Sequence, residues 1–245
     1  MKLREIAVKV NFEPFIYGIN ECSYNTREKY LSDCQEYYRD HVLLLDREFR
    51  LQTRNITSFF SRLLYKHFKN MQYPFSKVII SCCISENSSG TITDLEGIAE
   101  VKILYDYRMF PGKSEISKKH DALDIIMRGL KLISDCYGID MKPFEEVESM
   151  IVAADYRNNW VWNTKWNPGR TYNAIINIDH NLNETVIYLR IEAKNGSIVF
   201  NSALVTAKPD EWDYDFFLGK MVWQSTKEFV LFDKKNNIVG SWYET

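Results

Sequence analysis

Residues 185–200 read Thr-Val-Ile-Tyr-Leu-Arg-Ile-Glu-Ala-Lys-Asn-Gly-Ser-Ile-Val-Phe and carry the clearest structural signal in the sequence. Two runs rich in β-branched and aromatic residues flank the dipeptide Asn195-Gly196. An Asn-Gly dipeptide between such runs is the strongest short-range signal for a β-hairpin, because both residues tolerate the positive φ angles of a tight turn. The sequence therefore predicts paired strands over residues 185–194 and 197–207.

Further strands are predicted on either side of this hairpin. A short strand is expected at 160–162 and another at 172–179, separated by the turn sequence Asn167-Pro168-Gly169. Near the C-terminus, residues 229–232 are expected to pair with 238–243 across the polar residues 233–237. The last third of the chain is therefore predicted to be a β-meander.

The N-terminal half mixes helical and strand patterns. Apolar residues recur at helical spacing near 55–69, 118–137 and 143–154, and strands are expected at 5–12, 77–84 and 97–107. Residues 41–52 are expected to be extended. The predicted fold class is α+β, with antiparallel sheet in both halves and the three helices packed on it.

Length and composition limit the class of protein. The chain has 245 residues, of which 45% are hydrophobic and 26% charged, as is typical of a globular protein. One α+β domain over 1–245, or two packed lobes at 1–157 (mixed α/β) and 158–245 (mainly β), are both compatible with this length. The net charge of -2, from 31 basic and 33 acidic residues, gives no overall bias toward nucleic acid or anionic membranes.

The cysteines and the N-terminus indicate a cytoplasmic protein. No run approaches the roughly 20 apolar residues needed to cross a bilayer, and residues 1–5 lack the apolar core of a signal peptide. The five cysteines are odd in number, and adjacent Cys82 and Cys83 would point to opposite faces of a strand, which favours reduced thiols. No Cys-x-x-Cys spacing indicates a zinc site, and we expect no metal and no cofactor.

One motif suggests catalysis. Asp179 precedes Glu192-Ala193-Lys194 in the next predicted strand, and nucleases of the restriction-endonuclease type use an Asp and a Glu-x-Lys in this way to hold a divalent metal. Ordinary alternation along a solvent-facing strand produces the same pattern. Serine-hydrolase elbows, phosphate-binding loops and His-Glu-x-x-His pairs do not occur, which disfavours those enzyme classes.

A row of tryptophans gives a second alternative. Trp160, Trp162 and Trp166 share one parity and lie among four asparagines. If exposed, such a row would stack on sugars or nucleobases, whereas packing in the core of a large sheet is the more common use of tryptophan.

The segment 210–217 combines four acids with four aromatic residues, in the order Asp-Glu-Trp-Asp-Tyr-Asp-Phe-Phe. Pro209 and the acids suit the first turn of a helix, with Trp212, Phe216 and Trp223 expected on one face of it. Acids and aromatics together also suit a surface that anchors a basic protein. The candidate partner-binding residues are Asp210, Glu211, Trp212, Asp213, Tyr214 and Asp215.

These patterns favour a non-catalytic, cytoplasmic binding protein over an enzyme. The leading hypothesis is an immunity or inhibitor-type protein that neutralises a basic toxin or nuclease through segment 210–217. The alternatives are a metal-dependent nuclease using Asp179, Glu192 and Lys194, and a carbohydrate or nucleobase binding module using the tryptophan row.

Overall fold

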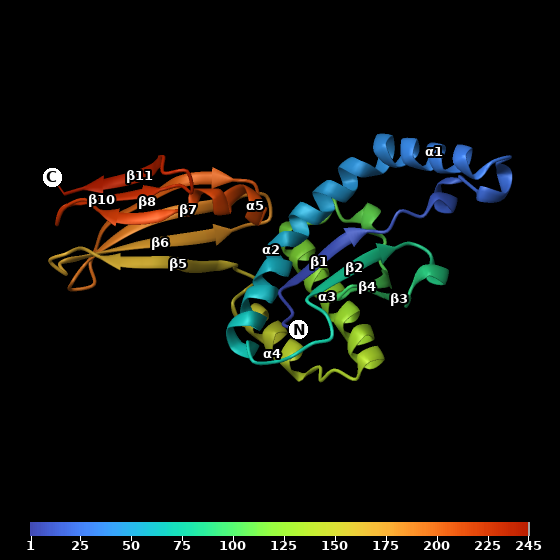
Figure 1. Ribbon diagram of the computed structural model, residues 1–245, viewed down its shortest axis with the longest axis horizontal. Helices are drawn as coiled ribbons and strands as arrows, with labels where there is room; N and C mark the ends of the chain where they lie inside the picture. Colours follow the sequence, from blue (N-terminus) through green and yellow to red (C-terminus); the bar gives the residue numbers. More distant parts are fainter. Residues whose placement is uncertain (245) are drawn as a thin grey trace. The chain divides into compact units, whose positions relative to one another are not determined.

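The computed structural model describes residues 1–244 and divides into two compact units, Met1–Tyr156 and Arg157–Thr245 (Figure 1). The N-terminal unit combines helices with one sheet, and the C-terminal unit is built mainly from strands. The predicted α+β class is confirmed. No helix among residues 1–244 has both the length and the apolar character required to cross a membrane.

The sheet of the N-terminal unit is mixed. Its strands are β1 (Glu5–Val10), β2 (Lys77–Cys83), β3 (Ile92–Leu95) and β4 (Ile98–Leu104), in the order β1-β2-β4-β3. The strands β1, β2 and β4 run parallel, and only β3 is antiparallel to its neighbour β4. This differs from the expected antiparallel sheet, because the chain leaving β2 first forms β3 at the sheet edge and then returns through the two-residue turn Glu96-Gly97 into β4.

Four long helices accompany this sheet: α1 (Arg27–Tyr37), α2 (Leu43–Phe68), α3 (Glu115–Tyr137) and α4 (Lys142–Ala153). The three predicted helices are confirmed, with α2 starting much earlier than expected. Residues 43–52 are helical rather than extended. The helical pattern of these residues was hidden by Asp46, because this acidic residue lies on the buried face of α2 and interrupts the apolar period in the sequence. In the structure its carboxylate accepts hydrogen bonds from the Val10 amide (3.1 Å) and the Tyr38 hydroxyl (2.8 Å).

Short helical turns complete the secondary structure. Their bounds are η1 (Pro14–Tyr17), η2 (Glu21–Ser23), η3 (Tyr38–Val42), η4 (Glu86–Ser88), η5 (Tyr107–Met109) and η6 (Asp215–Phe217).

The helix α3 packs closely on the sheet at Gly129. A Cβ atom at this position would lie 2.8 Å from two side-chain carbons of Ile80 in β2. Ile80 is fully buried, so its side chain has no free space into which to move. Glycine is therefore required here by the close approach of helix and strand.

The C-terminal unit contains two antiparallel sheets. The first is β5 (Asn159–Trp166), β6 (Tyr172–His180), β7 (Thr185–Ala193) and β8 (Ile198–Ala207), in sequential order. The second has the order β11-β10-β9 and consists of β9 (Lys220–Trp223), β10 (Glu228–Phe232) and β11 (Ile238–Tyr243). The predicted meander and the Asn195-Gly196 turn are confirmed, with Gly196 at φ 86°.

One core lies between these two sheets. From the first sheet it receives the alternate residues of β6 and β7, and from the second it receives residues such as Phe229, Leu231 and Trp242. Side chains of a strand alternate between its two faces, so burying one set leaves the other set on the outer face of the sheet. The unit is therefore a β-sandwich in which β5–β8 have a core face and an outer face (Figure 1).

The connection from β8 to β9 holds the only α-helix among the described residues of the C-terminal unit, α5 (Glu211–Tyr214), which continues directly into η6. This helix ends well before Trp223, which lies in β9. The predicted helical face of Trp212, Phe216 and Trp223 is therefore not formed. Residues 221–223 lie in β9 and pair with β10, so their side chains alternate between the two faces of a sheet and do not follow a helical period.

We expect Gly129→Ala to lower the free energy of unfolding of the N-terminal unit by about 1–2 kcal/mol, because the clash with Ile80 outweighs the gain in helix propensity. Urea denaturation followed by circular dichroism measures this. Gly112→Ala is the matched control, since its Cβ would meet nothing closer than 3.9 Å, and it should change stability by less than about 0.5 kcal/mol. Equal stability of the two variants would contradict the packing of α3.

A second prediction concerns acid stability at the β10–β11 turn. Burial acts to raise the pKa of Asp233, but hydrogen bonds from the Asn237 side chain and from the amides of Asn237 and Lys235 outweigh it and lower the pKa. A lowered pKa in the folded state means that the stabilisation is present above the unfolded value, about 4, and is lost as the pH falls through the folded value.

The stability advantage of the wild type over Asp233→Asn should therefore be full at pH 7 and shrink progressively below about pH 4. Thermal unfolding of both proteins between pH 7 and pH 3 measures the difference. A difference that stays constant over this range would show that ionised Asp233 does not stabilise the turn.

Candidate functional site

The three residues of the predicted nuclease motif do not come together. Asp179 pairs with Val186 beside the β6–β7 turn, whereas Glu192 pairs with Asn173 toward the other end of the same hairpin. Six residues of strand separate these positions, which corresponds to roughly 20 Å. Lys194 follows β7 and its amide donates to the Thr171 carbonyl. Two carboxylates at this separation cannot share one metal ion.

Two further kinds of catalytic site, a metal centre and a nucleophilic Cys82, find no support in the described part of the chain. Residues 1–244 contain no group of three His, Cys, Asp or Glu side chains arranged to hold a metal ion. All five cysteines are free, and burial raises the pKa of the Cys82 thiol, with a further contribution from Cys83. A buried thiol with a raised pKa is a packing residue rather than a nucleophile.

The tryptophan row is divided between the two faces of β5. A β-bulge between Val161 and Asn163 shifts the register of the strand. Before the bulge, Trp160 pairs with Ile178 on the core face, and after it Trp166 pairs with Asn173 on the outer face. Trp160 and Trp162 are half-buried against the core of the sandwich. Only Trp166, with 46% of its surface exposed, lies on the outer face.

Segment 210–217 forms a short, well-anchored helical turn. The Asp210 side chain caps α5 by accepting from the Trp212 amide at 3.2 Å. Tyr214, predicted to contact a partner, is instead buried in the core, where its ring packs edge-on against Trp160 and His180. Asp215 forms an ion pair with Lys234. Asp210, Tyr214 and Asp215 therefore all help to hold the segment in place.

Trp212 points in the opposite direction. Its side chain is 84% exposed, the highest value among the exposed large hydrophobic residues of the described chain. Neighbouring Asp213 is also exposed. On a short helix whose Tyr214 side is buried, residue 212 is carried to the solvent side by the helical rotation of about 100° per residue. The anchoring of Tyr214 therefore fixes the presentation of Trp212.

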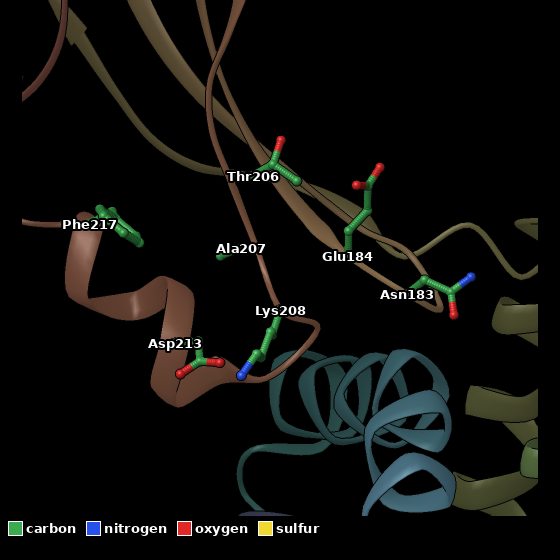
Figure 2. Close-up of a pocket in the computed structure, with 7 residues that line it drawn as sticks. All are labelled: Asn183, Glu184, Thr206, Ala207, Lys208, Asp213 and Phe217. Atoms are coloured by element: carbon green, nitrogen blue, oxygen red, sulfur yellow. The ribbon is translucent and has the colours of Figure 1, made fainter.

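A hollow of about 600 Å³ lies beside this segment. Figure 2 shows Asp213 and Phe217 on the helical segment, Lys208 on the chain that leaves β8, and Glu184 on the β6–β7 turn. The full lining is Asn183, Glu184, Thr206, Ala207, Lys208, Asp213 and Phe217. We call Trp212 together with these seven residues the Trp212 surface.

Sequence reasoning identified only Trp212 and Asp213 of this surface. Asn183 and Glu184 belong to a turn almost 30 residues away in the sequence, and they join the surface because β8 returns along β7 to that end of the sheet. The predicted hairpin was the only available signal, since it brings the end of β8 back beside Thr185; register shifts in the β7–β8 pairing then place Ala207, rather than Thr206, opposite Thr185.

Comparison of the chain with family models, curated proteins and solved structures found no match.

The anchoring of segment 210–217 predicts opposite effects for its two central aromatic residues. Tyr214→Ala should lower the free energy of unfolding by about 3 kcal/mol, because it leaves a cavity beside Trp160 and His180. Trp212→Ala should change it by less than about 0.5 kcal/mol, because the side chain is mostly exposed. Chemical denaturation measures both, and a large loss of stability in Trp212→Ala would show that Trp212 packs in the fold.

Proposed function

We propose that this chain is a non-catalytic binding protein that docks a basic protein partner on the Trp212 surface. The observation that supports it is the exposure of Trp212 on a segment that is anchored on its other side by Tyr214. Tryptophan is among the residues most enriched at the energetic centres of protein interfaces, where it is desolvated by the partner. A rigidly presented tryptophan loses little conformational freedom on binding.

Charge supports a basic partner. Asp213 and Glu184 line the hollow with a single base, Lys208, whereas Asp215 is already paired with Lys234. Acidic side chains at the rim of an interface increase the rate of encounter with a basic partner and fix its orientation, while they add little to the affinity itself. The aromatic residue and the acids therefore have separate roles, one in affinity and the other in steering.

More specifically, we propose an immunity or inhibitor-type protein. Its Trp212 surface would cover the basic, nucleic-acid-binding surface of a toxin or nuclease. Its proposed location is the cytoplasm, where the five cysteines would remain reduced. This class rests on the complementarity of an acidic, aromatic surface to a basic one.

The test begins by identifying the partner. A photo-crosslinking amino acid placed at Thr206, an exposed residue that lines the hollow, leaves Trp212 in place and should capture a basic protein from a lysate of the source organism. The same group at Tyr243, which is 65% exposed on β11, serves as the positional control. The captured protein is then purified for direct binding measurements. Capture of the same proteins at both positions would contradict the proposed surface.

Calorimetry with the purified partner decides the role of each residue. Trp212→Ala should weaken binding by about 30-fold or more, as expected of a hot-spot residue, while Tyr243→Ala should leave the affinity unchanged. Asp213→Lys should mainly lower the association rate and its dependence on salt. Equal affinity of Trp212→Ala and wild type would overturn the proposal. Loss of a nuclease or toxin activity of the partner on binding tests the inhibitor class separately.

A further inference from the structure

The outer face of β5–β8 presents an ordered array of polar side chains. Cross-strand pairing sets residues of the four strands in rows, of which the central two are Val161–Asn177–Tyr188–Ala203 and Thr164–Ile175–Arg190–Asn201. A third row begins with Asn159 and Asp179. A hollow of about 400 Å³ lies on these rows. It is lined by Asn159, Trp160, Val161, Asn177, Ile178, Asp179, Tyr188, Arg190 and Asn201.

Four of the polar side chains that line this hollow have no polar partner within residues 1–244. Within residues 1–244, the side chains of Asn177, Asp179, Tyr188 and Asn201 make no hydrogen bond or ion pair with the protein. The Nε atom of Arg190 lies 3.0 Å from Glu192, close enough for an ion pair, but it is not aligned for a hydrogen bond. Of these four, Asn177, Asp179 and Tyr188 are half-buried, and polar groups that are partly withdrawn from water without a protein partner gain most from hydrogen bonds to a ligand.

We propose that this outer face binds a neutral oligosaccharide. Each amide of Asn177 and Asn201 offers two donors and an acceptor, Asp179 adds acceptors and Arg190 adds donors. Sugar hydroxyls donate and accept at once, so neighbouring hydroxyls match a mixed set of this kind. The Tyr188 ring at the centre, flanked by Ala203, provides an aromatic surface for the apolar face of a sugar ring.

The charges and the shape of the face favour this ligand over others. Glu192 offsets Arg190 and leaves Asp179 uncompensated, so the array does not favour a phosphate or another anion. The apolar residues Ile175 and Val186 are only 5% and 6% exposed, so the exposed apolar surface of this face is limited to separate residues such as Val161 and Trp166, which do not form the continuous apolar centre of a protein interface. Four strands spaced by about 4.8 Å make a face about 14 Å wide, which suits an extended chain of sugars.

The experiment uses the full chain, isotope-labelled, and titrates it with neutral hexasaccharides of glucose, xylose, mannose and N-acetylglucosamine, with ATP as the anionic comparison. We expect amide shifts in two-dimensional NMR spectra that concentrate on β5–β8 for at least one hexasaccharide. The double variant Asn159→Ala/Asn201→Ala should weaken that binding by about ten-fold or more, since both positions are exposed and replaceable without loss of packing.

Trp212→Ala serves as the control, because it alters the protein-docking surface and not the outer face. Its affinity for the hexasaccharide should equal that of the wild type. A failure of the sugar-binding proposal can therefore be distinguished from a failure of the proposed protein docking. Tyr188→Phe keeps the ring and should retain binding better than Tyr188→Ala. The proposal is overturned if no hexasaccharide binds, if only ATP binds, or if the double variant binds as tightly as the wild type.

Discussion

The packing of one face of β5–β8 against β9–β11 is the constraint on which the rest of the C-terminal unit depends. Because side chains alternate along a strand, burying Ile176, Ile187 and Leu189 in the core commits their neighbours to the outer face. The same packing obliges the chain to pass from one sheet to the other after β8. Segment 210–217 makes this passage, and it is secured to the core by Tyr214.

Both proposed surfaces follow from that constraint. Tyr214 cannot be buried beside Trp160 without turning Trp212 away from the core, and the outer face cannot be covered by the second sheet that packs on the other side. The two surfaces also differ in chemistry. An exposed aromatic residue with acids suits a protein partner, whereas unpaired amides around Tyr188 suit a polyhydroxylated ligand. The residues that line the two hollows are different, although both surfaces include residues of β8.

Local signals in the sequence predicted the elements well and the assembly poorly. The Asn195-Gly196 turn and the helical period of 118–137 depend on neighbouring residues, and both are confirmed by the structure. The parallel pairing of β1, β2 and β4 depends on which distant strands meet, and alternation within one strand does not determine this. Asp46 concealed the start of α2 because two of the groups that stabilise its carboxylate, the Val10 amide and the Tyr38 hydroxyl, lie outside the helix, and only Arg50 is its neighbour at i+4.

The candidate sites show the same limit. Segment 210–217 was identified from its composition, but composition could not separate buried Tyr214 from exposed Trp212. The tryptophan row failed because a single bulge after Val161 moved Trp166 to the other face. Asp179 and Glu192 have suitable spacing in the sequence, yet hairpin pairing places them toward opposite ends of the strands.

Hydrogen–deuterium exchange of the full chain, with and without the captured partner, shows whether the partner binds at the Trp212 surface. Slowed exchange on binding should concentrate in residues 208–217 and in the β6–β7 turn at 181–184. Protection confined to other elements, with unchanged exchange at 208–217, would contradict it.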